Sequence, residues 1–252
     1  MGLTSQYLAN MPIIELDSID STNNYAMRLI DADTAQHGLC ITANYQTAGK
    51  GQRGKQWDNA ACESLLMSII VVPSWIIDQQ FLLSATVAVA VADVLTTLHP
   101  TWNVAIKWPN DIFINDKKTA GILIENVLRG NKWQFAVIGI GLNVLQTEFS
   151  SSLPHASSLL IQSGKKYSLH ELRESLLSKI IAALEPATSP LQIIASYNDY
   201  LYRKECNQRF VNEDKEWSAI INEVTLDGKL HVTEHGGTSA YYVHGNQLWC
   251  LG

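Results

Sequence analysis

The sequence predicts an α+β fold in which a mixed sheet packs against helices and is followed by a small β-barrel. Strand-like and helix-like segments mix without the regular βαβ alternation of a doubly wound parallel sheet. After Lys204, short apolar runs are separated by Asp-Gly, Gly-Gly and Gly-Asn turns, which is typical of a small barrel. A chain of 252 residues suits one large domain with an appendage, and we expect domains at residues 1–203 and 204–252.

Hydrophobic periodicity and turn residues predict the individual elements. Strands are expected at residues 13–19, 39–45, 65–72, 104–108, 112–115, 119–126 and 133–140. Helices are expected at residues 24–30, 81–98, 169–184 and 191–202, and a loop at residues 146–158. Barrel strands are expected at residues 209–211, 217–221, 229–233, 240–243 and 247–250. Residues 81–98 are apolar but include Ser84, Thr86 and Asp93, so they predict a buried helix and not a membrane span.

Composition and charge narrow the functional class. A hydrophobic content of 46% with 17% charged residues is typical of a globular protein with a sizeable core. The net charge of −6 argues against a general nucleic-acid binder, which should be basic. The four cysteines lack metal-ligand spacing, and the N-terminus lacks the pattern of a signal peptide, so we expect reduced thiols in a cytoplasmic protein.

The most informative stretch is a basic glycine-rich loop at residues 46–57. Backbone amides beside its three glycines, together with fixed cations, form the kind of cradle that binds phosphate. The Gly-x-Gly-x-x-Gly spacing matches a dinucleotide fingerprint, but that motif must open a helix, and a strand is predicted after Trp57. A solvated basic hairpin loop is the alternative. The glycines and cations of the loop are Gly49, Gly51, Gly54, Lys50, Arg53 and Lys55.

Three further motifs carry polar groups at the ends of predicted elements. Ser21, Thr22 and Asn23 are suited to capping a helix, or to binding a polar ligand at its start. The sequence Lys-Trp-Pro-Asn-Asp at residues 107–111 places a lysine at a strand end, next to an Asn and an Asp, and such an arrangement is costly unless the polar groups have partners. The alternative is an ordinary turn in which the Asn and Asp cap the backbone and the lysine reaches solvent. The sequence Gly-Ile-Gly-Leu-Asn at residues 139–143 permits close backbone approach, or marks a β-bulge.

Motifs for other chemistries are missing from the sequence. It contains neither a Gly-x-Ser-x-Gly nucleophile elbow nor a His-Glu-x-x-His pair. We therefore predict neither a covalent nor a zinc mechanism, and no metal site built by protein ligands.

The four motifs, in this order and at these separations, resemble the biotin protein ligase (biotin–[acetyl-CoA-carboxylase] ligase) family over about residues 13–145. The resemblance implies a class II synthetase-like catalytic domain followed by an SH3-like barrel. It also implies a two-step reaction in which biotin and ATP form biotinyl-5′-AMP, with Mg²⁺ on the phosphates, and biotin then passes to a lysine of a biotin carboxyl carrier protein.

The resemblance assigns roles to individual residues. It implies that Lys107, Arg53 and Lys55 stabilise the charge that develops as the adenylate forms. The residues implied to contact biotin or ATP are Ser21, Thr22, Asn23, Gln46, Gly49, Lys50, Gly51, Gln52, Trp57, Lys107 and Asn143. The first three, with Gln46, would bind the ureido ring, Trp57 would flank the adenine, and Asn143 would lie near the phosphates.

The chain departs from the commoner family loop, Gly-Arg-Gly-Arg-x-Gly-Arg-x-Trp. Lys50 and Lys55 replace two arginines, and Gln52 replaces a third. Lysine lacks the bidentate fork of arginine, and glutamine has no charge. We hypothesise that Arg53 partly replaces the missing cation, or that the adenylate is held less tightly.

Other expectations concern partners and rival functions. Because the Ser-Thr-Asn motif begins at residue 21, we expect a ligase without an N-terminal DNA-binding domain and without sequence-specific DNA binding, with a homodimer possible. The alternatives are a lipoate or octanoate ligase or transferase of the same fold, and a non-catalytic sensor of biotin or nucleotide.

Overall fold

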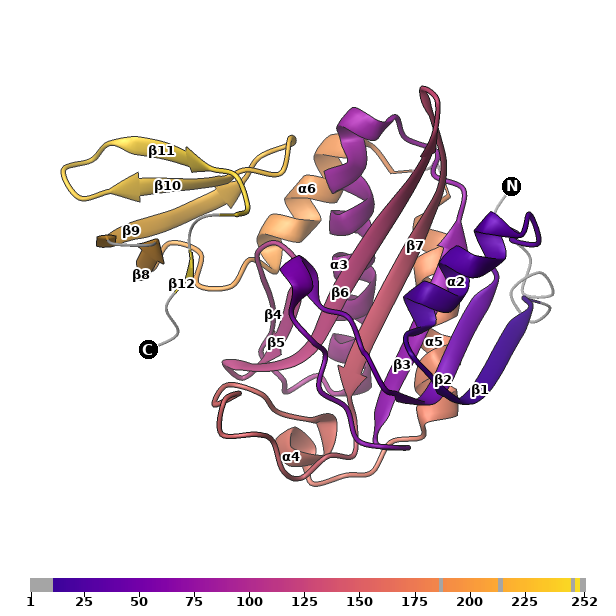
Figure 1. Cartoon of the computed structure of the whole chain (residues 1–252). Coiled ribbons are helices and arrows are strands. Elements are labelled where there is room, and N and C mark those ends of the chain that lie inside the picture. The colour runs from indigo at the N-terminus through magenta and orange to yellow at the C-terminus, as the bar shows by residue number, and fades with distance from the viewer. Residues whose placement is uncertain (1–10, 186–187, 213–214, 246–247, 250–252) are drawn as a thin grey trace.

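Two sheets and five α-helices make up the part of the chain that the computed structural model describes, namely residues 11–185, 188–212, 215–245 and 248–249 (Figure 1). The larger sheet has the order β1-β2-β3-β7-β6-β5-β4 and the smaller one the order β11-β10-β9-β8-β12. The strands of the larger sheet are β1 (Ile13–Ile19), β2 (Cys40–Gln46), β3 (Ser64–Val71), β4 (Val104–Lys107), β5 (Asp111–Ile114), β6 (Lys117–Arg129) and β7 (Lys132–Asn143). The helices are α2 (Thr22–Asp31), α3 (Gln80–Leu98), α4 (Leu159–Ser163), α5 (Leu169–Ala183) and α6 (Pro190–Asp199).

The mixed character predicted for the larger sheet is confirmed. Strands β1 and β2 pair in parallel, and every other pair of neighbours in this sheet is antiparallel. The predicted elements differ from the observed ones mainly at their ends. One such difference is at β7, which continues through Asn143, so that this residue is the last of the strand and does not follow it. The short helix α4 was not predicted.

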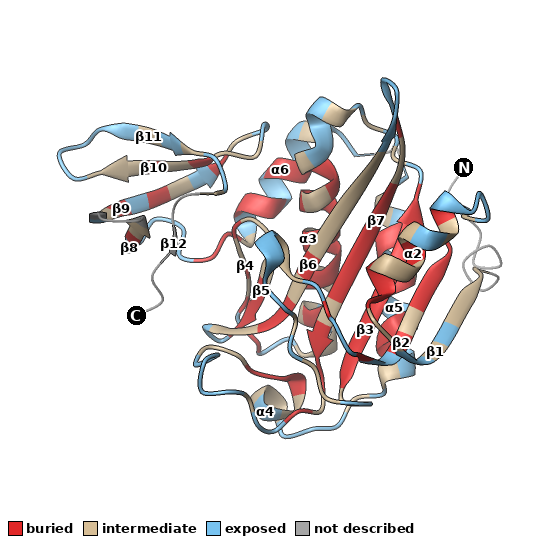
Figure 2. Ribbon diagram, viewed as in Figure 1, coloured by how far each residue is buried: buried red, intermediate tan, exposed pale blue. Residues whose placement is uncertain are grey.

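Helices cover the two faces of the larger sheet unequally, which exposes the site. One face packs against α3, α5 and α6, whose side chains join those of the strands in the main core (Figures 1 and 2). Among the described residues, α2 is the one helix on the other face, and its Ala26 and Ile30 pack with Ile41, Ile70 and Val137 in a small second core. Because α2 has only ten residues, it packs on β2, β3 and part of β7 and leaves the rest of this face open.

Helix α3 is the buried helix that the sequence predicts. The segment Ile77–Leu98 is long and apolar enough to cross a membrane by length and composition alone. In this fold, however, it packs against α5, α6 and β4, and 56% of its apolar window is buried. The apolar surface of this helix is therefore buried mainly against other parts of the protein.

The smaller sheet consists of β8 (Asn207–Asn212), β9 (Lys215–Val224), β10 (Leu230–Glu234), β11 (Ser239–Tyr242) and β12 (Leu248–Trp249), all paired antiparallel. This arrangement is consistent with the small barrel expected. Residues 247 and 250, which were predicted to be the first and last residues of the last strand, lie outside the described residues. The domain boundary at residues 203 and 204 stays a prediction.

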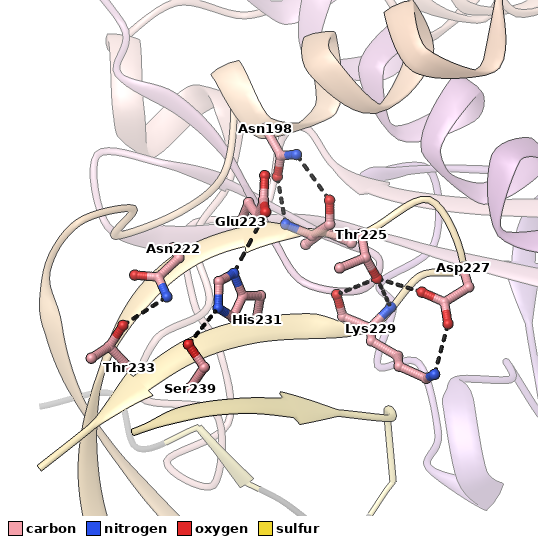
Figure 3. A network of polar contacts seen from close by, with 10 residues as sticks. Asn198, Asn222, Glu223, Thr225, Asp227, Lys229, His231, Thr233 and Ser239 are labelled. Carbon is pink, nitrogen blue, oxygen red and sulfur yellow. Dashed lines mark hydrogen bonds and ion pairs between the residues drawn. The ribbon is translucent and has the colours of Figure 1, made fainter. Parts of the chain in front are cut away.

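Polar contacts attach the smaller sheet to the larger domain. The side chain of Asn198 in α6 accepts from the backbone N–H of Val224 at 2.7 Å and donates to its carbonyl at 2.9 Å (Figure 3). The indole Nε1 of Trp108 donates to the carbonyl of Gly228 at 3.0 Å. Gly228 has a φ of +80°, and a Cβ there would lie 2.5 Å from the ring of Phe81, so a glycine is needed at this contact.

We expect Asn198→Ala to lower the free energy of unfolding by about 1–3 kcal/mol, because it leaves two buried backbone groups without partners. Urea denaturation measures this loss. Asn222→Ala is the control, since Asn222 makes one partly buried bond to Thr233 and its loss should cost less (Figure 3). Equal losses in the two variants would contradict an anchoring role for Asn198.

Candidate active site

The open face of the larger sheet forms the floor of a cavity of about 500 Å³, a volume typical of small-ligand sites. Side chains alternate along a strand, so Ser68 on β3 and Gly139, Gly141 and Asn143 on β7 lie on the same face as α2. Every residue predicted for the site, except Gly49, lines this cavity. The fold therefore brings the four sequence motifs together.

The Ser-Thr-Asn motif forms a buried polar cluster at one end of the cavity. Ser21 occupies the N-cap position of α2, but its side chain makes no capping hydrogen bond, so a plain helix cap does not explain it. The backbone N–H and hydroxyl of Thr22 donate to Gln46 Oε1 at 2.7 and 3.1 Å. Ser21, Thr22, Asn23 and Gln46 are each at most 7% exposed. The cluster is a preorganised set of hydroxyl and amide groups.

Ser68 belongs to this cluster and was missed in the sequence. It is fully buried, and its Oγ lies 2.7 Å from Thr22 Oγ1 and 2.6 Å from Asn23 Oδ1. The signal was a serine inside the apolar strand β3, since a buried hydroxyl needs a hydrogen-bond partner. Gly139 leaves room for the same cluster, because a Cβ there would lie 2.3 Å from Asn23 Oδ1. The strand is regular at this point, so the β-bulge interpretation is wrong.

The basic loop at residues 46–57 is a hairpin-like segment that lies over the cavity. An isolated bridge pairs Lys50 with Gln56, and the backbone N–H of Gly51 donates to the carbonyl of Lys55 at 2.7 Å. Arg53, at the tip, has a φ of +56°, and its guanidinium donates to the carbonyl of His244 at 3.3 Å. The loop thus has hairpin-like backbone pairing and presents its cations to the cavity.

Two glycines, Gly49 and Gly141, permit close contacts with Trp57 that were not predicted from the sequence. Gly49 does not line the cavity; a Cβ there would lie 2.7 Å from the carbonyl of Trp57, so the glycine permits close packing at the base of the loop. A Cβ at Gly141 would lie 2.4 Å from the indole of Trp57. The Trp57 ring therefore rests on the glycine floor of β7. Its Nε1 is buried without a hydrogen-bond partner among the described residues.

The Lys-Trp-Pro-Asn-Asp segment places its lysine at the cavity wall. Lys107 ends β4 and is half-buried where it lines the cavity. Asn110 Nδ2 donates to the carbonyl of Ile122 at 2.5 Å, and Asp111 forms an ion pair with Lys118 at 2.7 Å. The capped-turn interpretation is therefore wrong in detail, because Asn110 and Asp111 bind the neighbouring strand β6.

Comparison with known proteins agrees with this geometry. The model of the biotin/lipoate A/B protein ligase family matches residues 15–143. The chain is 30% identical over 233 residues to the bifunctional ligase/repressor BirA of Escherichia coli, covering 88% of this chain and 69% of that protein. The chain belongs to the biotin/lipoate A/B protein ligase family.

The chain is also similar to a curated biotin ligase and to a solved biotin ligase structure. The chain is 35% identical over 126 residues to a biotin–[acetyl-CoA-carboxylase] ligase of Paracoccus denitrificans, covering 50% of this chain and 51% of that one. The structure of the biotin protein ligase of Aquifex aeolicus in complex with biotin and ATP aligns with a TM-score of 0.79 at 21% identity, over 96% of this chain and 99% of that one. The fold of the two proteins is the same.

In this member of the ligase family, the side chain of Asn143 is already engaged. Its Nδ2 donates to the carbonyl of Ser157 at 3.1 Å, and its Oδ1 accepts from Gln146 at 3.2 Å. Asn143 therefore fastens the loop at residues 146–158 to the end of β7. The role near the phosphates that the resemblance implies for it stays a prediction.

The smaller sheet contributes to the ligase site through a segment that sequence reasoning missed. His244 lines the cavity, and its ring meets that of Trp108 edge to face at a centroid distance of 5.4 Å. Burial lowers the pKa of His244, and the nearby cations Arg53, Lys107 and Lys55 lower it further. The imidazole is therefore neutral at pH 7. Nothing in the local sequence signals this placement, because it depends on how the two sheets dock.

Electrostatics of the ligase cavity favour an anionic ligand. The charged residues that line it are Lys50, Arg53, Lys55, Lys107, Lys118, Asp58 and Asp111. Among the described residues, no three His, Cys, Asp or Glu side chains form a cluster that could hold a metal ion. The residues thus fit Mg²⁺ only in the mode in which the ion is bound mainly by nucleotide phosphates and water.

Proposed function

We propose that this chain is a biotin–protein ligase, which activates biotin with ATP to biotinyl-5′-AMP and transfers biotin to a lysine of a biotin carboxyl carrier domain. The observation that carries this function is the joining, in one cavity, of a buried amide and hydroxyl cluster to a cation-rich loop and Lys107. The Paracoccus relative is a biotin–[acetyl-CoA-carboxylase] ligase, and the Aquifex ligase binds biotin and ATP.

The polar cluster suits the head of biotin. A ureido ring offers a carbonyl acceptor and two N–H donors, which the groups of Ser21, Thr22, Asn23 and Gln46 can match. Because these groups are buried and already held by one another, binding costs little further ordering. A ligand without hydrogen-bonding groups at this end would leave the remaining donors and acceptors of the cluster without partners, so the cluster discriminates against purely apolar acids.

The cations suit the first chemical step. An oxygen of the biotin carboxylate attacks the α-phosphorus of ATP, the bond to the β-phosphate oxygen breaks, and pyrophosphate leaves. This step brings two anions together, so fixed cations that face the reacting atoms lower its barrier. Lys107, on the rigid end of β4, is the proposed principal cation, and Arg53 and Lys55 act from the loop. Mg²⁺ on the phosphates, when bound, would neutralise further negative charge.

In the second step the ε-amine of the acceptor lysine attacks the mixed anhydride, and AMP leaves. No protein nucleophile is needed. The basic loop, fastened at its base by the hydrogen bond from Trp57 N–H to the carbonyl of Gly49, is positioned to cover the intermediate and exclude water. Trp57 would flank the adenine.

An ATP–pyrophosphate exchange assay tests the choice of acid. We expect exchange with biotin and at most about one hundredth of that rate with lipoate or octanoate, because those acids leave the remaining donors and acceptors of the buried polar cluster without partners. Exchange that is faster with lipoate would indicate the lipoate branch of the family. Biotin binding without any exchange would support the non-catalytic sensor.

Gln52→Arg is expected to slow the release of biotinyl-5′-AMP several-fold. Arg53 is directed to the carbonyl of His244, which supports the version of our hypothesis in which the missing cation is not replaced. An added guanidinium at residue 52 can bind the phosphate in a bidentate manner. The release rate is measured by chasing bound adenylate, with Gln36→Arg, an exposed site elsewhere, as the control. Equal release rates in wild type and Gln52→Arg would exclude this version.

The acceptor is proposed from the chemistry of the family. Incubation with biotin, ATP, Mg²⁺ and a biotin carboxyl carrier domain should give a biotinylated lysine, detected by mass spectrometry. Cytoplasmic location, lack of sequence-specific DNA binding and possible dimerisation stay predictions.

A further inference from the structure

Glu125 lies behind the polar end of the cavity and has no part in the mechanism described so far. Its Oε1 accepts from Lys50 Nζ at 3.1 Å, and its Oε2 accepts from Asn23 Nδ2 at 2.7 Å. Glu125 is on β6, Asn23 is in the first turn of α2, and Lys50 is the first cation of the basic loop. One carboxylate therefore joins the proposed ring site to the proposed adenylate loop.

The contact with Glu125 sets the orientation of the Asn23 amide. An asparagine side chain has a donor end and an acceptor end, and only the donor end can face a carboxylate. The Nδ2 group also points to the carbonyl of Leu123 at 3.4 Å, while Ser68 Oγ lies 2.6 Å from Oδ1. These hydrogen bonds hold the amide in one orientation, and the missing side chain of Gly139 leaves room for Oδ1.

The contact with Lys50 holds the loop. The side chains of Lys50 and Glu125 are 39% and 30% exposed, and ion pairs as exposed as this add little to stability. Holding the first cation of the loop over the cavity is the more important consequence, because the lysine side chain is otherwise flexible. Glu125 itself does not line the cavity, so it acts through its two partners.

We infer that Glu125 is a positioning residue for the activation of biotin, which orients Asn23 for the ring and places Lys50 for the adenylate. This inference rests on the proposed function. Since both partners share one carboxylate, the ring site and the loop are coupled, and a change at Glu125 must affect both biotin affinity and the rate of adenylate formation.

The test begins with Glu125→Gln, which keeps the size of the side chain but removes its charge. A glutamine must turn its own N–H group toward one of two donors, so we expect the Kd for biotin to rise about tenfold and adenylate formation to slow by a similar factor. Calorimetry measures biotin binding, and single-turnover kinetics measures the rate. Asp33→Asn is the control, because it removes an exposed ion pair with Arg129 on the same strand.

A double-mutant cycle separates positioning from a general structural effect. Glu125→Gln should slow adenylate formation much less in a Lys50→Met background than in wild type, because the residue that it positions is already gone. Glu125→Asp, which keeps the charge, should restore part of the biotin affinity. The thermal denaturation midpoint of each variant checks that it folds. If Glu125→Gln unfolds the chain, Glu125→Asp carries the same comparisons.

The outcomes are distinct. Wild-type protein that binds no biotin would refute the proposed function and this inference with it. If the wild-type protein binds biotin, and Glu125→Gln is within twofold of it in both biotin affinity and the rate of adenylate formation, the inference is overturned but the proposed function is not. Additive effects of Glu125→Gln and Lys50→Met would overturn the coupling to the loop.

Discussion

Lys107→Met is expected to slow the formation of biotinyl-5′-AMP by about 10²–10³-fold or more, while the protein stays folded. The lysine ends β4 and lines the cavity wall, where a cation can face the carboxylate and the α-phosphate. Methionine preserves much of the apolar stem and removes the charge, so the effect falls on the transition state and not on packing. Single-turnover kinetics with saturating biotin and ATP measures the rate.

The control for this prediction is Lys132→Met, which removes an exposed lysine at the start of β7. It should leave adenylate formation unchanged, because exposed charges far from the site are screened by solvent and salt. If Lys107→Met keeps activity within a few-fold of wild type, the proposed role of Lys107 is wrong.

Gly139→Ala and Gly141→Ala are expected to weaken the binding of different substrates, although the two glycines are only two residues apart on one strand. A Cβ at Gly139 would lie 2.3 Å from Asn23 Oδ1, and a Cβ at Gly141 would lie 2.4 Å from the Trp57 indole. Overpacking of this kind costs about 1–3 kcal/mol, which corresponds to roughly 5- to 150-fold in affinity if the displaced group binds ligand. Gly139→Ala should therefore raise the KM for biotin, and Gly141→Ala the KM for ATP.

Steady-state exchange kinetics, with each substrate varied in turn, distinguishes the two variants. Gly130→Ala in the β6–β7 turn is unsuitable as a control because its φ is +59°; Ser175→Ala, on a helix on the other face of the sheet, introduces no clash and serves instead. Equal effects of both glycine variants on both substrates would show that the open face is not divided into a ring end and an adenine end.

Most of the fold could be predicted from local sequence patterns, because its helices and strands are specified largely by residues that are close in the sequence. The two-residue period of the strands and the apolar run of α3 follow from local geometry and burial. Consecutive strands that pair as hairpins, such as β6 and β7, need only a short turn. The helix α4 escaped prediction because it has only five residues and depends on a serine cap.

The candidate site was predicted unevenly for the same reason. Residues within the four motifs were identified because glycines, cations and amides in one short stretch indicate a ligand. Glu125 and His244 each belong to a strand or turn whose local sequence gives no such sign, and the sign for Ser68 is a single serine inside an apolar strand. Glu125 acts on Asn23 across 102 positions, and the carbonyl of His244 accepts from Arg53 across 191. Only the folded chain brings such residues together.

The sequence alone determined the class of fold, the four motifs and the chemistry that they suit, because composition and spacing act locally. The tertiary structure decided which face of the sheet is the site. That choice depends on the length of α2, which covers one part of the face and leaves Gly139, Gly141 and Asn143 beneath an open cavity. It also decided that the glycines of β7 make room for Asn23 and Trp57, since the distance between side chains on different elements is fixed only by packing.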